Sequence, residues 1–205
     1  MFVNEELLHR SIAHFTIAIN GVALAAIVGI PLGLFLSRQR LLATPVIALL
    51  EGLQTVPSLA MLSILLVFVG IGNSSAIVAI FCYSILPIVR NTYTGITSVE
   101  PSLIEAGRGM GMNSLQLLIQ VEIPNAIPLI ISGLRVSQIT AYGIVTIAVL
   151  IGGGGLGMYV YRGIQRSNME MLLTGAIPIC IMAIATDMLM NKAERRLARH
   201  NLHHR

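Results

Sequence analysis

The chain has 205 residues, of which 55% are hydrophobic and 11% charged, and its formal net charge is +4. Soluble domains carry about 25% charged residues, so this composition excludes an ordinary soluble protein and predicts an all-α integral membrane protein. The basic residues stand beside apolar segments, as membrane topology requires, so the positive charge does not indicate nucleic-acid binding.

The first membrane span is predicted over residues 12–37, because no Asp, Glu, Lys or Arg occurs between Ser11 and Ser37. A helix of about 20 apolar residues is long enough to cross a bilayer. Pro31 stands between two nearby glycines and predicts a bend within this span. The residues before the span are acidic where a signal peptide would be basic, so we expect the span to be retained.

The next uncharged run, 52–89, is too long for one crossing, and the polar stretch 70–75 divides it. We therefore predict a second span over 44–69 and a third over 75–94. Pro57 falls inside the second span and should kink or break it, because proline lacks the N–H of a helical hydrogen bond.

Fourth and fifth spans are predicted over 126–150 and 171–190, which places the two termini on opposite sides of the membrane. The side of the C-terminus would carry Arg38, Arg40, Arg90, Arg108, Arg135, Lys192, Arg195, Arg196, Arg199 and Arg205, and the other side only Arg10, Arg162 and Arg166. Because Lys and Arg are enriched in cytoplasmic loops, the C-terminus and the loop 95–125 are predicted to be cytoplasmic and the N-terminus outside.

The cytoplasmic loop 95–125 is polar and contains several glycines. Pro101 fits the first turn of a short helix, and Asn113 with Gln116 resembles a capping box that starts a second one. Gly111 lies between them, where a tight turn can require a positive φ. The loop is either an ordinary surface connection or an element that docks a partner.

Small residues in this loop would allow close approach of a partner, and methionines would add adaptable apolar contact. The residues that we expect to make these contacts are Ala106, Gly107, Gly109, Met110, Gly111 and Met112.

The loop also resembles a known signature. The segments Glu105-Ala106-Gly107, Gly111 and Val121-Glu122-Ile123-Pro124 are similar to the EAA motif of permeases of bacterial ABC importers, which reads Glu-Ala-Ala, three residues, Gly, nine residues, Ile-x-Leu-Pro. The spacing matches throughout, and the differences at Gly107, Val121 and Ile123 are conservative. The number of spans and the position of the loop resemble the type I, methionine-permease-like fold, as a single transmembrane domain over 1–205.

Three further segments, 54–58, 86–91 and 150–157, are similar to permeases for compatible solutes, which import glycine betaine, carnitine and choline. Methionine permeases share related segments, so methionine or another amino acid is the alternative cargo. We expect high-affinity recognition to lie on a separate binding protein, because the few aromatic residues are scattered.

The chain contains no phosphate-binding loop of the form G-x-x-x-x-G-K-[ST] and is therefore not expected to be the ATPase. The resemblance implies a bacterial cytoplasmic membrane location and two copies of an ATPase subunit, which would bind ATP and Mg and dock on residues 101–118. It also implies a second permease, identical or homologous, and an extracytoplasmic substrate-binding protein. Within the loop it implies that Glu105 anchors the docking helix, Gly111 forms its turn and Pro124 joins it to the fourth span.

Five residues are candidates for the transport pathway or gate. For the tyrosines the alternative is ordinary anchoring at a membrane interface, and for the glycines a flexible connector. The candidates are Pro57, Tyr142, Gly153, Gly154 and Tyr159.

Glu51 and Asp187 lie in or near spans, where carboxylates are costly. We expect them to pair with basic residues such as Arg38, Arg40 or Lys192 rather than to carry cargo.

Two other function classes compete. A secondary transporter or channel would need an intramembrane relay of ionisable groups or inverted repeats, and neither is clear. A membrane-embedded enzyme would need a convergent catalytic set or metal ligands. Cys82 and Cys180 lie in apolar runs without metal-ligand spacing, and the tail histidines are expected to be solvated: His200, His203 and His204.

Overall fold

The structure, a computed structural model, describes the backbone of residues 2–202 and the side chains of residues 5–197. Arg205, His203 and His204 lie outside the described residues, as do the side chains of Arg199 and His200. The described chain is helical and has no strand. Its elements are α1 (Phe2–Arg38), α2 (Arg40–Gln54), α3 (Ser58–Val69), α4 (Asn73–Thr97), α5 (Pro101–Gly109), α6 (Ser114–Leu117), the π-helical turn η1 (Leu118–Glu122), α7 (Ile123–Ala148), the 3-10 turn η2 (Val149–Ile151), α8 (Gly157–Gln165) and α9 (Met169–Leu202).

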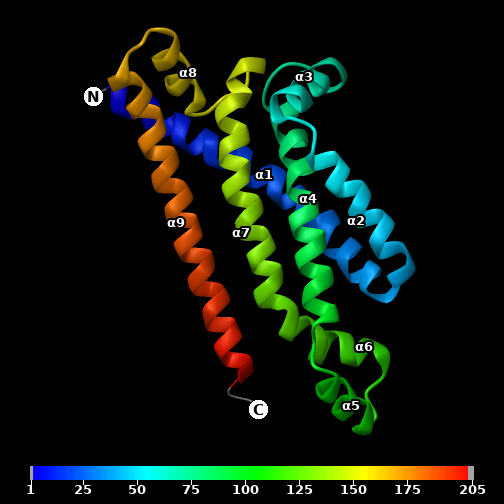
Figure 1. The fold of residues 1–205 in the computed structure, drawn as a ribbon. Helices are drawn as coiled ribbons and strands as arrows, with labels where there is room; N and C mark the ends of the chain where they lie inside the picture. Colours follow the sequence, from blue (N-terminus) through cyan, green and yellow to red (C-terminus); the bar gives the residue numbers. More distant parts are fainter. Residues whose placement is uncertain (1, 203–205) are drawn as a thin grey trace.

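Four helices among the described residues are long and apolar enough to cross a membrane: Glu5–Arg38, Asn73–Thr97, Ser114–Ile151 and Met169–Leu197. They contain the predicted spans 12–37, 75–94, 126–150 and 171–190. In Figure 1 the N-terminus, α3 and α8 lie at one end of the bundle, and α5, α6 and the C-terminus at the other.

The predicted second span, 44–69, is not one straight helix. The chain breaks at Pro57, where α2 and α3 meet at 93°. At about 1.5 Å per residue α3 is only about 18 Å long, shorter than the roughly 30 Å hydrocarbon core, so α3 alone is too short to span the bilayer. The break is held against α4, because Gln54 Nε2 donates to the carbonyl of Tyr83 at 2.6 Å and the Tyr83 hydroxyl donates to the carbonyl of Val56.

The core lies where α1 crosses α4 and α7 (Figure 1). Gly29 and Gly33, one turn apart on α1, face α4, and α1 continues as helix through Pro31 between them. A Cβ at Gly33 would lie 2.7 Å from the Cβ of Thr92, so a larger residue would force the helices apart. Packing through small residues is typical of membrane helices, because it lets their backbones approach closely.

Candidate functional site

The candidate site is the α5–α6 segment, which we define as residues 101–122. It connects α4 to α7 and projects beyond them at the end of the bundle (Figure 1). The position between the third and fourth predicted spans agrees with the sequence. The second short helix differs from the prediction, because α6 runs through η1 directly into α7.

Local hydrogen bonds shape the turn between the two short helices. Gly111 has a φ of +82°, which confirms the positive φ predicted there. The capping box is also confirmed: the Asn113 side chain accepts from the Gln116 N–H at 2.9 Å, and the Gln116 side chain accepts from the Asn113 N–H at 2.8 Å. The turn is therefore determined by residues close in the sequence.

Gly107 makes a close contact within the segment. It is buried, and a Cβ there would lie 2.6 Å from Cδ2 of Leu117 and 3.3 Å from Sδ of Met112. Met112 is half-buried in the same contact. The small size of Gly107 thus lets α5 pack onto α6, and Gly107 lies inside the segment, whereas Met112 stays partly accessible.

The opposite face of the segment is open. A Cβ added at Gly109 or Gly111 would meet nothing within 4 Å, and Met110 is 71% exposed. Glu105 and Ala106 are also exposed. These residues form one accessible surface of small, apolar and acidic character.

Two apolar residues of the same segment, Leu115 and Ile119, are also exposed, at 63% and 56%. The sequence interpretation missed them, although their spacing of four residues would have indicated a common helical face. Exposed apolar side chains in an otherwise polar segment are candidates for contact with a partner. We call the whole surface the docking face; it consists of Glu105, Ala106, Gly109, Met110, Gly111, Leu115 and Ile119.

The base of the segment is fixed by an ion pair that the sequence did not indicate. Glu122 is 4% exposed, and its carboxylate accepts two hydrogen bonds from the guanidinium of Arg38, one of them from Nη1 at 3.1 Å. Arg38 is the last residue of α1 and is half-exposed. A bidentate arginine–carboxylate pair fixes both distance and orientation, so it joins α1 to the start of α7.

The π-helical turn η1 has a local cause. Pro124, half-buried near the start of α7, has no N–H to donate to the carbonyl four residues earlier, and the ring crowds that turn. The Asn125 side chain donates to the carbonyl of Val121, in the same turn, at 2.7 Å. Pro124 therefore lies at the junction with the fourth span, as predicted, and widens the helix there.

The glycine-rich loop at the other end of the bundle, residues 152–157, is packed rather than flexible. Gly155 has a φ of +96°, and a Cβ there would lie 3.2 Å from the Cβ of His14. The Leu156 N–H donates to His14 Nδ1 at 3.3 Å, and His14 Nε2 donates to the carbonyl of Tyr142 at 3.2 Å. The loop is therefore bound to both α1 and α7.

The predicted gate residues do not gather in one place. Tyr142 is buried in the core, where its hydroxyl shares a hydrogen bond of 2.8 Å with Thr186 of α9. Tyr159 is covered by Arg10, whose guanidinium carbon lies 5.7 Å from the ring centroid. Gly153 is buried in the loop, and the Gly154 N–H donates to the Asn73 side chain at 2.7 Å.

Pro57 borders a cavity, which has a volume of about 500 Å³ and lies beside the break between α2 and α3. Its polar lining residues come from α2, α3, α4 and α7, and no described residue that lines it is charged. They are Gln54, Thr55, Ser58, Tyr83 and Thr140. Its volume lies within the range of small-molecule sites, roughly 300–1,000 Å³.

The acidic residues in or near the spans are paired, as expected, but with other partners. Glu51 forms a salt bridge with Arg90, and Asp187 lies 3.7 Å from Nε of Arg135. Among the residues that the structure describes, no group of three or more His, Cys, Asp or Glu side chains is placed to hold a metal ion.

Comparison with known proteins connects this architecture to a transport family. Residues 12–199 match the family described as "binding-protein-dependent transport system inner membrane component". Among curated proteins, the glycine betaine/carnitine/choline transport system permease protein OpuCD of Bacillus subtilis is 45% identical over 90% of this chain and 81% of its own length. The osmoprotectant import permease protein OsmW of Salmonella typhimurium is 43% identical over 88% of this chain and 86% of its own length.

A solved structure of the inward-facing MetNI methionine ABC transporter has the same fold. Its TM-score is 0.82 and its sequence identity 22%, over 93% of this chain and 95% of the solved chain. At that identity the likeness concerns the fold alone.

Proposed function

Since this chain belongs to the family of binding-protein-dependent transport system inner membrane components, we propose that it is the permease subunit of an ATP-driven importer of compatible solutes. The docking face carries this proposal, because it combines an EAA-like signature with an exposed apolar surface at the end of the bundle. A separate ATPase, in two copies, binds this face and supplies ATP and Mg. A second permease, identical or homologous, completes the membrane part.

The proposed cargo is glycine betaine, carnitine or choline. The names of curated relatives at 43–45% identity describe them as permeases for these solutes or for osmoprotectants. The cavity beside Pro57 has a volume in the range of small-molecule sites, which is compatible with a solute of this size. An amino-acid cargo has only the 22% likeness in fold in its favour. An extracytoplasmic binding protein delivers the solute at the end of the bundle that carries α3 and α8.

Coupling proceeds through the base of the α5–α6 segment. When the ATPases close, they move the docking face, and the continuous helical path through η1 passes this movement to α7. The pair between Arg38 and Glu122 passes it to α1. The bundle thereby changes between arrangements in which the pathway is open to one side or the other, as alternating access requires.

The docking contact is tested by crosslinking. In a C82A/C180A background, Met110→Cys is introduced on the docking face, and Ile164→Cys serves as the control because it is 61% exposed at the opposite end. With a cysteine placed on the surface of the co-expressed ATPase, only the Met110→Cys variant should crosslink. Crosslinking from both positions or from neither would contradict the proposal.

The transport activity is tested with the complete transporter in proteoliposomes. ATP-dependent uptake of radiolabelled glycine betaine, carnitine and choline is compared with that of methionine, in the presence of the cognate binding protein. Methionine uptake without uptake of any of the three solutes would overturn the cargo and leave the permease role intact.

The role of the turn is tested in the same vesicles. Gly111→Val places a β-branched residue at a φ of +82° and should leave the protein inserted while coupled uptake is lost. Gly52→Ala is the control, because Gly52 lies within helix α2, outside the docking face, and its Cβ would meet nothing within 4 Å. Normal coupled uptake by Gly111→Val would remove Gly111 from the mechanism.

A further inference from the structure

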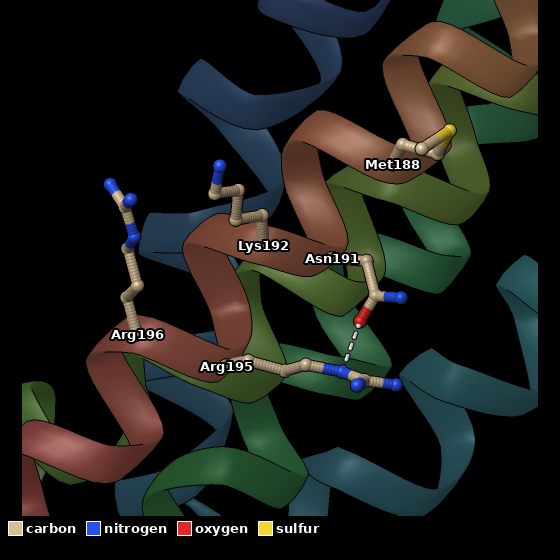
Figure 2. Close-up of a pocket in the computed structure, with 5 residues that line it drawn as sticks. All are labelled: Met188, Asn191, Lys192, Arg195 and Arg196. Carbon is tan, nitrogen blue, oxygen red and sulfur yellow. Dashed lines mark hydrogen bonds between the residues drawn. The ribbon is translucent and has the colours of Figure 1, made fainter.

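The last turns of α9 that the structure describes in full carry three basic residues: Lys192, Arg195 and Arg196. With Met188 and Asn191 they line a hollow of about 440 Å³ (Figure 2). In Figure 2 Lys192 and Arg196 extend from the same side of the helix, whereas Arg195 leans the other way, where its Nε donates to Asn191 Oδ1 at 3.0 Å. Two cations four residues apart thus share one face.

Charges of opposite sign are separated around α9. Asp187 and Glu194 both turn toward α7, where each lies 3.7 Å from the guanidinium of Arg135. Among the described residues, by contrast, Lys192 and Arg196 form no salt bridge and both are exposed. The outward side of α9 therefore ends in positive charge that no carboxylate within the described chain neutralises.

An exposed apolar stripe leads along α9 to these two cations. Its residues recur at the spacing of one helical face and are between 52% and 65% exposed. They are Ile177, Ile181, Ile184 and Met188. At 1.5 Å per residue the distance along the helix from Ile181 to Lys192 is about 16 Å, which matches one leaflet of a hydrocarbon core roughly 30 Å thick.

We propose that this face of α9 is a binding site for an anionic phospholipid. Lys192 and Arg196 bind the phosphodiester of its headgroup, and one acyl chain lies along Ile181, Ile184 and Met188. The arrangement along α9 favours a lipid over a protein as the occupant. The apolar residues come first and the cations follow, which matches the order of acyl chain and phosphate in a phospholipid. A cytoplasmic leaflet rich in anionic lipid would favour the same contact by about 1 kcal/mol for each basic residue.

The test is native mass spectrometry of the complete transporter in detergent, titrated with dioleoylphosphatidylglycerol or dioleoylphosphatidylcholine. The variant Lys192→Gln/Arg196→Gln should bind phosphatidylglycerol about thirtyfold more weakly than the unchanged protein, since each lost charge removes about 1 kcal/mol. Binding of phosphatidylcholine should not change. Raising the ionic strength should weaken binding of phosphatidylglycerol to the unchanged protein, because salt screens exposed charges.

The matched control is Arg162→Gln/Arg166→Gln, which removes two exposed basic residues at the opposite end of the bundle. This control should retain phosphatidylglycerol. Equal loss in both variants, or no loss in Lys192→Gln/Arg196→Gln, would overturn the site.

Two further arms separate a lipid from other occupants. Inorganic phosphate at millimolar concentration should not displace phosphatidylglycerol, because it lacks the acyl chain; displacement would identify a site for free phosphate and overturn the proposal. Binding of phosphatidylglycerol to the isolated permease but not to the complete transporter would show that a protein subunit covers this face, and would also overturn it.

Discussion

The two ends of the bundle use glycine in opposite ways. In the α5–α6 segment Gly111 has a positive φ and a Cβ there would meet nothing, so glycine serves only the turn. In the loop 152–157 Gly155 also has a positive φ, but the backbone lies directly against His14. The α5–α6 segment is thus an exposed surface fixed at its base, whereas the loop 152–157 is packed against several helices.

This contrast distinguishes an open surface on one segment from a packed loop on the other. The exposed segment leaves the docking face free and is fixed by a capping box and one ion pair. The loop contributes its N–H groups to His14 and Asn73 and exposes little. Variants at each end should therefore differ in both size and kind of effect.

The largest expected effect follows removal of Arg38, because it leaves Glu122 buried without a partner. Arg38→Ala should destabilise the protein by about 3 kcal/mol, as for other broken buried pairs. Glu122→Gln should cost less, because Arg38 is half-exposed and can be hydrated. Thermal unfolding in detergent measures both, and a milder effect of Arg38→Ala than of Glu122→Gln would refute the assignment of the ion pair as the fixed base.

A smaller effect is expected at the packed end. Gly155→Ala adds a Cβ against His14 at a left-handed φ, and should cost about 2 kcal/mol. Gly154→Ala is the control, because its φ is not positive and its Cβ would make ordinary contact, 3.4 Å from the Asn73 side chain. The melting temperature should fall only for Gly155→Ala. Equal tolerance of both changes would mean that the loop is not packed as described.

The smallest effect is expected from the capping box. Asn113→Ala removes one side-chain acceptor and should cost about 1 kcal/mol, confined to the exposed segment. Hydrogen exchange of the amides of residues 114–117 should accelerate while that of α4 and α7 stays unchanged. Ser102→Ala is a suitable control, since its hydroxyl bonds only to the side chain of Glu100. Acceleration throughout the bundle would show that the segment is not an independent local unit.

The same contrast decides what could be predicted from the sequence. The turn at Gly111 and the cap at Asn113 depend on residues a few positions apart, so their pattern was visible. The contact of Leu156 with His14 joins residues 142 positions apart, and that of Arg38 with Glu122 joins residues 84 apart. Such pairs leave no local pattern.

The break that the sequence predicts at Pro57 in the second span is confirmed, but its angle could not be predicted. Hydropathy shows how apolar residues 44–69 are, but it does not show the direction in which each helix of this segment runs. The 93° angle at Pro57 is accompanied by contacts of Gln54 and Val56 with Tyr83, which is distant in the sequence. The positions of the gate candidates could not be predicted from hydropathy either. Tyr142 is aromatic and lies in a span, but it is buried between helices, where its hydroxyl shares a hydrogen bond with Thr186 of α9.

The unbroken course of α7 has a mechanical consequence. Its 26 residues make a stiff rod of about 39 Å at 1.5 Å per residue. If the rod pivots near the π-helical turn, a tilt of about 10° displaces its far end by roughly 7 Å, more than one helical turn. A small movement at the docking face thus becomes a larger displacement at the far end of α7, about as wide as a small solute. The hydrogen bond between the Tyr142 carbonyl of α7 and His14 of α1 lies toward that end and would be strained early by such a tilt.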